Sequence, residues 1–166
     1  NLKNSKVSIN LDEKSKSINL EGLYSFDNKN YLAFQMTNEY FKNSFALDIK
    51  ADLREKINLE ILNYTKKKDT KANFSLIFTK MKNDLRIKEL NFNQDDTQIS
   101  INDLKVSNGN LISINKLKVK TYLNGKNNND FTLILNDKIF INGTKADASN
   151  LPKILSENPQ TNNLKK

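Results

Sequence analysis

Apolar and polar residues alternate along most of the chain, and this period of two restricts its fold more than any other feature. Because successive residues of a β-strand point to opposite faces of a sheet, each alternating run predicts a strand with one apolar face. The runs recur about every 12 to 14 residues, which is too short for the helical crossover that parallel strands need. We therefore expect antiparallel strands joined by hairpins. The runs occupy residues 7–11, 18–26, 32–36, 45–51, 57–61, 72–78, 131–135 and 139–141.

Between these runs, the pattern apolar-x-apolar-x-x-apolar-x-apolar occurs in three successive copies, at residues 85–92, 99–106 and 112–119, with a fainter copy at 18–25. In a straight strand the two halves of this pattern would point to opposite faces. The residues between the halves are the polar pairs Lys88-Glu89, Asn102-Asp103 and Asn115-Lys116. Polar insertions favour a bulge over burial of both faces. Bulges at the same height on neighbouring strands would curl the sheet into a trough.

Turn and capping signals complete the predicted fold. Asn108-Gly109 predicts a tight hairpin. The segment 147–158 predicts a helix of about two turns, with Ser149 or Asn150 as N-cap and Pro152 in its first turn. The expected fold is mainly β: a curved antiparallel meander sheet, open as a trough (β-taco-like), with one short C-terminal helix. Residues 1–158 are expected to be a single β-rich domain or a segment of a longer repeat protein, and 159–166 a polar tail.

Composition agrees with half-solvated strands, because 37% of the residues are hydrophobic while the mean hydropathy is −0.68. The net charge of +8 would suit nucleic acid. The lysines are scattered and mostly lie beside acidic residues, so we expect no nucleic-acid partner and only a secondary attraction to anionic lipid headgroups. No apolar run approaches the roughly 18 residues of a membrane span. Because the first residue is Asn1, we expect the chain to be a piece of a larger protein.

The residue types needed for most catalytic and metal sites are missing. The chain has no His and no Cys, which excludes Ser-His and Cys-His nucleophile pairs and the usual zinc ligand sets. Asp95-Asp96 is expected to be a solvated turn, and the run Lys66, Lys67, Lys68 a solvated loop. We therefore expect no catalytic residues, no metal and no cofactor, and the chain is not expected to be an enzyme.

The segment FINGTKADASNLPKIL, residues 140–155, resembles a recurrent segment of the AsmA-like superfamily, and within it the central region of YhdP-type envelope proteins. The motif there reads roughly Gly-x-x-x-Asp-x-x-x-Leu, which corresponds here to Gly143, Asp147 and Leu151. The upstream strand copies are similar to the repeats of those proteins, so the resemblance covers about residues 85–155.

The resemblance implies a non-enzymatic role in lipid transport and outer-membrane biogenesis. The parent protein would be periplasmic, anchored in the inner membrane of a Gram-negative bacterium, and would pair this piece with neighbouring β segments of the same chain. An apolar concave face would shield phospholipid acyl chains between the two membranes, since each exposed methylene costs about 0.8 kcal/mol. The candidate lining residues are Ile99, Ile101, Leu104, Val106, Ile112, Ile114, Leu117, Val119, Leu133, Leu135, Ile139 and Ile141.

Two other interpretations stay open at the level of sequence. Each candidate lining residue could instead be an ordinary core residue, packed against the helix or a second sheet. The whole chain would then be a structural or adhesive extracellular β-domain with a filled core. A glycan-processing enzyme on a β scaffold would need clustered carboxylates in a groove, and the sequence offers no such cluster.

Overall fold

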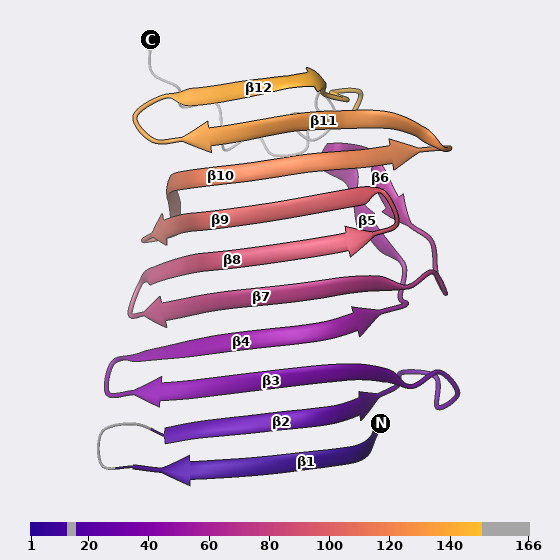
Figure 1. Cartoon of the computed structure of the whole chain (residues 1–166). Helices are drawn as coiled ribbons and strands as arrows, with labels where there is room; N and C mark the ends of the chain where they lie inside the picture. The colour runs from indigo at the N-terminus through magenta and orange to yellow at the C-terminus, as the bar shows by residue number, and fades with distance from the viewer. Residues whose placement is uncertain (13–15, 151–166) are drawn as a thin grey trace.

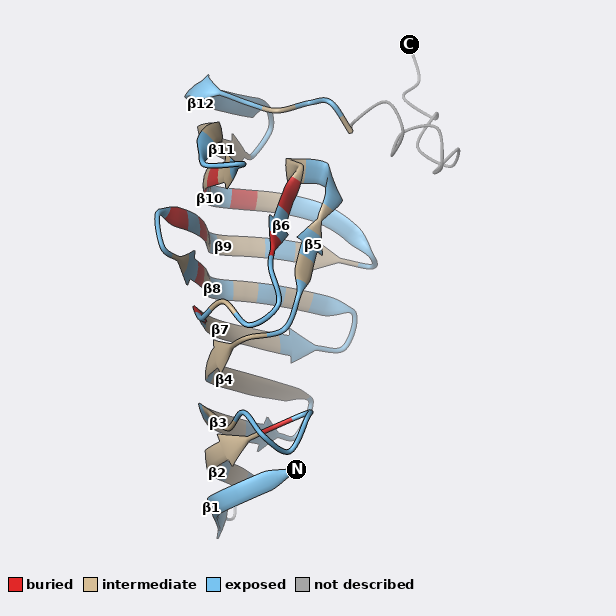
Figure 2. Ribbon diagram, turned by 90° about the vertical axis from the view of Figure 1, so that its right-hand side faces the viewer, coloured by how far each residue is buried: buried red, intermediate tan, exposed pale blue. Residues whose placement is uncertain are grey.

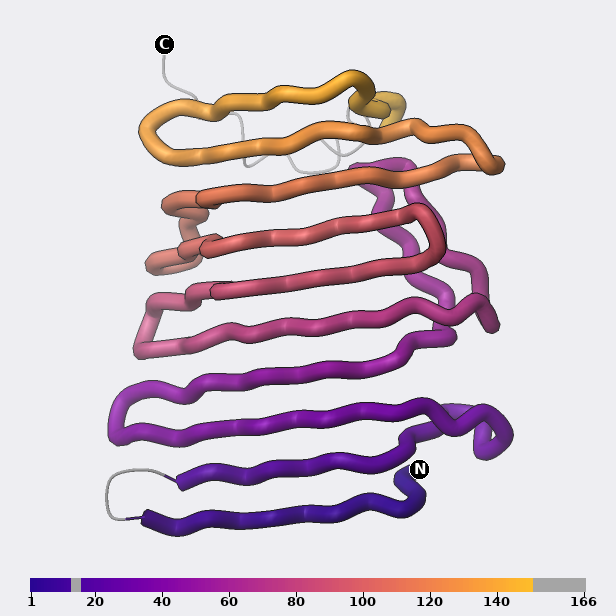
Figure 3. The backbone as a smooth tube through the Cα atoms, in the orientation of Figure 1, coloured from indigo at the N-terminus to yellow at the C-terminus, as the bar shows by residue number. Residues whose placement is uncertain are grey.

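Ten strands form a single antiparallel sheet that is not closed into a barrel (Figure 1). The structure is a computed structural model and describes residues 1–12 and 16–150. Spatial order follows chain order, so each strand of this sheet pairs with the next one along the chain, and residues 54–71 form a longer connection between the fourth and fifth strands (Figure 3). The strands of this sheet are β1 (Leu2–Leu11), β2 (Lys16–Tyr24), β3 (Leu32–Phe41), β4 (Ser44–Leu53), β7 (Ala72–Met81), β8 (Asp84–Gln94), β9 (Thr97–Ser107), β10 (Asn110–Leu123), β11 (Lys126–Leu135) and β12 (Ile139–Lys145). The predicted antiparallel meander is confirmed.

The two faces of the sheet differ sharply in chemistry. Along one row of directly paired residues, every one of the ten strands contributes an aliphatic side chain. The row consists of Val7, Leu20, Met36, Ile49, Leu76, Leu90, Ile101, Leu117, Leu133 and Ile141. We call this the aliphatic row, and the face that carries it the apolar face.

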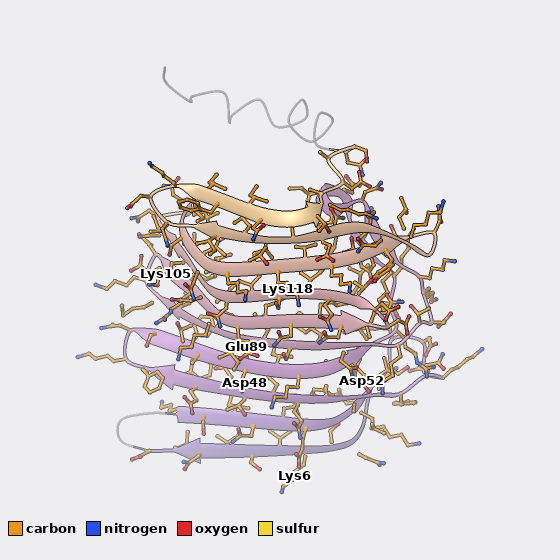
Figure 4. The ribbon with its side chains drawn as sticks, turned by 45° about the horizontal axis from the view of Figure 1, so that its top comes forward. Lys6, Asp48, Asp52, Glu89, Lys105 and Lys118 are labelled. Carbon is orange, nitrogen blue, oxygen red and sulfur yellow. The ribbon has the colours of Figure 1, made fainter. Side chains whose placement is uncertain are left out.

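The neighbouring residue in each strand lies on the opposite, polar face. The row there is polar in every strand: Lys6, Glu21, Gln35, Lys50, Ser75, Asn91, Ser100, Lys118, Thr132 and Asn142. Figure 4 labels six charged side chains spread over this polar face. The alternation in the sequence therefore becomes two faces of opposite character in one sheet.

Bulges at one height explain how the repeated pattern keeps its apolar residues on one face. Glu89 pairs with Asn102, and Asn102 with Lys116, while the pairs on either side are all apolar. One residue of each strand is left out of these pairings: Lys88, Asp103 and Asn115. Asp103 adopts the left-handed conformation, with φ of 50°. The predicted bulge is confirmed for all three clear copies.

The fainter copy does not contain this bulge. Strand β2 pairs with β3 without interruption from Lys16 to Tyr24, so Leu23 lies on the polar face, opposite to Leu20. Figure 2 shows the far ends of β8, β9 and β10 bending toward the side of the sheet on which β5 and β6 lie. The three clear copies of the pattern, in contrast, lie in β8, β9 and β10.

A small hairpin covers one end of the apolar face. It consists of β5 (Ile57–Leu59), a 3₁₀ turn (Glu60–Leu62) and β6 (Tyr64–Lys66). Tyr64 of the hairpin is 3% exposed and belongs to one buried cluster with Ala72, Phe92 and Ile99 of the main sheet. The Tyr64 and Phe92 rings meet edge to face, with centroids 6.0 Å apart. The hairpin and the main sheet therefore enclose a small hydrophobic core between them.

The hairpin departs from two sequence expectations. The run expected to continue as a strand through Ile61 ends at Leu59, since residues 60–62 turn and Asn63 takes a left-handed φ of 45°. Lys66 was expected to be solvated but is fully buried, and its Nζ donates to the carbonyl of Glu55 at 2.8 Å and to that of Lys67 at 3.2 Å. Burial lowers the pKa of the Lys66 ammonium. Lys67 and Lys68 are exposed, as expected.

The predicted C-terminal helix, with Leu151 and Pro152, and the polar tail 159–166 lie outside the described residues. Across residues 1–12 and 16–150, no helix has the length and hydropathy needed to cross a bilayer.

Candidate functional site

Eleven of the twelve candidate lining residues lie on the apolar face. They form rows that cross β9 to β12. The rows are Ile99–Val119, then Ile101–Leu117–Leu133–Ile141, then Leu104–Ile114–Leu135–Ile139, while Val106 pairs with Leu85 and Leu111. The exception is Ile112, which is the unpaired residue of a bulge between Leu111 and Ser113 and is 52% exposed. Leu111 takes the place in the row that the sequence pattern gave to Ile112.

The covering of the apolar face changes along the sheet. Val119 is fully buried, and Ile99, which belongs to the core cluster under the hairpin, is 7% exposed. These two residues are therefore core residues here, as the alternative interpretation expected. At the β12 edge, Ile139 and Ile141 are 64% and 62% exposed. Within the described part of the chain, the hairpin covers only one end of the face, and most of the aliphatic row has no second layer over it.

The apolar face extends well beyond the residues that sequence analysis selected. The aliphatic row continues from β8 to β1 through Leu90, Leu76, Ile49, Met36, Leu20 and Val7. A second row alongside it is rich in aromatic residues, with Phe34, Phe74, Phe92 and Phe131. The sequence places these residues in predicted strands, but the candidate lining was restricted to residues 99–141. Aligning all the alternating runs by phase would have found them.

Lysines lie at the rim of the apolar face. In the row farthest from the hairpin, Lys16 pairs with Tyr40, and Lys80 pairs with Phe45 and Leu85. Leu11, Val106 and Leu111 extend this row at its two ends. The row contains no acidic residue among these positions, so cationic ammonium groups border an apolar surface. This arrangement suits a ligand that has an apolar body and an anionic end.

Two of the motif residues hold the C-terminal end of the sheet together. At Gly143, a Cβ would lie 2.3 Å from the carbonyl oxygen of Asp130 and 2.5 Å from Cα of Phe131, so only glycine permits this close approach of β12 to β11. The Asp147 carboxylate accepts hydrogen bonds from the Ser149 hydroxyl at 2.5 Å and from the Asn63 amide at 2.9 Å. These bonds hold the pKa of Asp147 well below its ordinary value, that from Ser149 contributing most. Leu151, the third motif residue, lies outside the described residues.

A cluster of amides binds the tip of the hairpin to the sheet. The Asn129 side chain is 1% exposed, and its Nδ2 donates to the Leu62 carbonyl at 2.7 Å and to Thr121 Oγ1 at 2.8 Å. Its Oδ1 accepts from the backbone N–H of Asp147 at 2.7 Å. We call Asn63, Thr121, Asn128, Asn129 and Asp147 the amide clasp. The clasp is not predicted by the alternating pattern, and its one signal in the sequence is the run of asparagines at 127–129.

The acidic residues of the described part of the chain do not gather into a metal site. Asp95 and Asp96 form the turn between β8 and β9, where Gln94 pairs with Thr97. Across residues 1–12 and 16–150, no three of the carboxylates come together as a metal site would require. The sheet presents a broad apolar face with lysines at its rim. Hydrogen bonds of the amide clasp hold the hairpin against one end of that face.

Comparisons of the chain with protein-family models, with curated proteins and with solved structures found no match.

Proposed function

We propose that the chain is a segment of an envelope-spanning lipid-transfer protein, in which the apolar face of an open, trough-shaped sheet shields phospholipid acyl chains between the inner and outer membranes. One observation carries the proposal: all ten strands contribute an aliphatic residue to a single continuous row. A sheet face inside a globular core is covered by a second layer, whereas most of this row has no such cover among the described residues.

The dimensions of the aliphatic row suit acyl chains. Neighbouring strands lie about 4.8 Å apart, so a row through ten strands is on the order of 40 Å long. The hydrocarbon core of a bilayer is about 30 Å thick and contains two layers of acyl chains. One acyl chain would therefore find apolar contact over its full length, and each methylene removed from water would contribute about 0.8 kcal/mol.

The surroundings of the row support the same role. The opposite face is polar in every strand, so the sheet can stand in an aqueous compartment with one face in water. Lys16 and Lys80 at the rim would attract the phosphate of a headgroup that stays in solvent. The resemblance of residues 85–155 to AsmA-like proteins agrees with a periplasmic parent anchored in the inner membrane.

A structural or adhesive β-domain with a filled core is the second candidate. The observation in its favour is the cluster of Tyr64, Ala72, Phe92 and Ile99, where the hairpin already covers part of the face as a core would. On this alternative the rest of the apolar face would also be filled by protein and would not bind lipid.

Adjacent residues of β7 offer a matched test. Leu76 belongs to the aliphatic row, while Ile77 pairs with Asp48 and Glu89 on the polar face, and both side chains are half-buried. We expect wild-type protein and Ile77→Lys to carry phospholipid from the expression host in native mass spectrometry. Leu76→Lys should carry several-fold less, because a charge in the row interrupts the apolar contact.

Circular dichroism and thermal melting of the three proteins provide the control for folding. A folded Leu76→Lys without lipid, beside a lipid-bearing Ile77→Lys, would support the proposal. Wild-type protein without lipid, after purification without detergent, would favour the filled-core alternative. Unfolding of Leu76→Lys alone would identify the row as core.

A further inference from the structure

The two ends of the strands differ in the residues that they expose. At one end the hairpin covers the apolar face, and the turn between β8 and β9 there is Asp95-Asp96. The opposite end, at the left of Figure 1, is formed by the turns that follow β1, β3, β7, β9 and β11, and we call it the far end. Two neighbouring turns of the far end, after β3 and β7, are Lys42-Asn43 and Lys82-Asn83. We call these two the lysine turns, and neither contains an acidic residue.

Large apolar side chains of the inner strands are exposed mainly at the far end. In the strands from β2 to β11 of the main sheet, six such residues are exposed, and five of them lie at this end. The five are Tyr40, Phe41, Met81, Leu111 and Ile112, and the sixth is Leu123. These strands have a neighbour on both sides, so a missing strand does not explain the exposure. The exposure belongs to the strand ends themselves.

At the lysine turns, both faces of the sheet end in apolar residues. Tyr40 lies on the apolar face and is 45% exposed. On the polar face, Phe41, Ser44 and Met81 form the last row, and Phe41 and Met81 are 46% and 53% exposed. Ile112, which its bulge takes out of the apolar rows, lines one hollow together with Met81. A partner that lay on the apolar face alone would leave Phe41 and Met81 in water.

Lysines surround these apolar side chains. Lys16 and Lys80 lie in the last row of the apolar face, and Lys42 and Lys82 lie in the lysine turns. All four residues are exposed, and none of the four forms an ion pair within residues 1–12 and 16–150. Asp84 is the one acidic residue in the last rows of β3, β4, β7 and β8. A lysine stem can lie along apolar surface while its ammonium reaches toward a phosphate, so the far end suits a partner that is apolar inside and anionic outside.

We propose that the far end inserts its lysine turns into an anionic lipid surface. A bilayer interface surrounds an inserted turn, so it takes up apolar side chains from both faces of the sheet. Apolar groups that enter the boundary between headgroups and acyl chains gain from leaving water, and each lysine near an anionic surface adds attraction. A further β-strand cannot occupy this place, because a turn has no free strand edge.

The inference goes beyond the proposed function and does not rest on it. Vesicle binding reports on the far end, whereas lipid carried in native mass spectrometry reports on the apolar face. Either measurement can therefore fail while the other succeeds.

A single tryptophan can report which part of the chain enters the membrane. The chain contains no Trp, and Phe41 and Phe26 are both exposed phenylalanines, at opposite ends of the strands. With phosphatidylcholine vesicles that contain phosphatidylglycerol, the emission of Phe41→Trp should shift to shorter wavelength, and that of Phe26→Trp should stay unchanged. Pure phosphatidylcholine vesicles should shift neither. A sheet lying flat on its apolar face would leave residue 41 in water, so an unshifted Phe41→Trp in vesicle-bound protein would overturn the proposal.

Charge reversal at the two ends supplies a matched comparison. Lys42→Glu/Lys82→Glu acts at the far end, and Lys29→Glu/Lys126→Glu makes the same change of net charge at exposed residues of the hairpin end. In sedimentation with the phosphatidylglycerol vesicles, the first variant should bind at least about tenfold more weakly than wild type, and the second should lose much less. Circular dichroism and thermal melting show whether each variant is folded, and Phe41→Trp tests insertion without any change of charge. No binding by wild type, or equal losses in the two variants, would also overturn the proposal.

Discussion

At the scale of single residues, the contact between hairpin and sheet depends on a few buried polar groups. The Tyr64 hydroxyl donates to the Gln94 side chain, while its ring packs on Phe92. Burial raises the pKa of Tyr64 to about 12, from an ordinary value of 10.0. The folded state therefore favours the neutral phenol.

This shift predicts a loss of stability at high pH. Below pH 10 the phenol is protonated in both states, and the contribution of Tyr64 is complete. Between pH 10 and about 12 only the unfolded state releases the proton, so the free energy of unfolding falls as the pH rises. Relative to Tyr64→Phe, wild-type protein should lose on the order of 2 kcal/mol across this range. Urea unfolding at several pH values measures the difference, and parallel curves for the two proteins would contradict it.

Lys66 shows what periodicity cannot reveal about a single residue. Its place in a run of three lysines predicts a solvated side chain, and Lys67 and Lys68 follow that prediction. Lys66 is buried because the carbonyls of Glu55 and Lys67 turn toward its ammonium. Those acceptors are placed by the path of the chain around the hairpin, which no local pattern encodes.

At the scale of strands and turns, the repeated bulge determines which side chains share a face. Asp103 is the extra residue of β9 and takes a φ of 50°, while its carboxylate lies 2.5 Å from Nε of Arg86. Without the extra residue, only one half of β9 could keep its apolar side chains on the same face as those of β8 and β10.

Deleting Asp103 should therefore be far more damaging than changing its side chain. The deletion would move either Ile99 and Ile101 or Leu104 and Val106 to the polar face, at a cost of roughly 3 kcal/mol or more. Asp103→Ala keeps the residue count and should be far less damaging, because it removes only a surface ion pair and places alanine at a left-handed φ. Urea denaturation gives both values. Equal stability of the two variants would show that the bulge does not set the phase.

Strands and turns were predictable where one local signal decides the structure. Asn108-Gly109 was predicted as a hairpin, and both residues have positive φ, 49° and 79°. The similar turn at Asn124-Gly125, with φ of 51° and 75°, was visible in the sequence but was not recognised. The hairpin β5–β6 was not predictable as a separate element, because a short alternating run fits a strand lying across the sheet as well as a strand within it.

At the scale of the whole molecule, the sheet is a linear array. Each strand of the main sheet pairs only with its neighbours, and the hairpin adds contacts at one end of the apolar face, chiefly around Phe92 and Ile99. Alternation and hairpin spacing predicted this array, but they could not predict which part of its apolar face would be covered. That depends on the amide clasp, whose members are up to 84 residues apart in the chain.

Stability in such an array should be local, because the stability of a linear assembly is close to a sum of units and nearest-neighbour interfaces. Leu20→Ala in β2 and Leu117→Ala in β10 remove the same atoms from the same aliphatic row. Leu20 lies near the β1 edge, whereas Leu117 packs against the core cluster under the hairpin. The two substitutions should therefore weaken different parts of the sheet.

Hydrogen exchange of backbone amides, followed by mass spectrometry, can locate each effect. Leu20→Ala should raise exchange about tenfold in β1 to β3, for a local loss of roughly 1.4 kcal/mol, and should leave β8 to β10 unchanged. Leu117→Ala should raise exchange in β9 to β11 and in residues 57–66, and leave β1 and β2 unchanged. If either substitution raises exchange equally in all ten strands, the sheet unfolds as one cooperative unit and the description as a linear array is wrong. Local effects would instead mean that the apolar face near β1 can open while the clasped end stays folded.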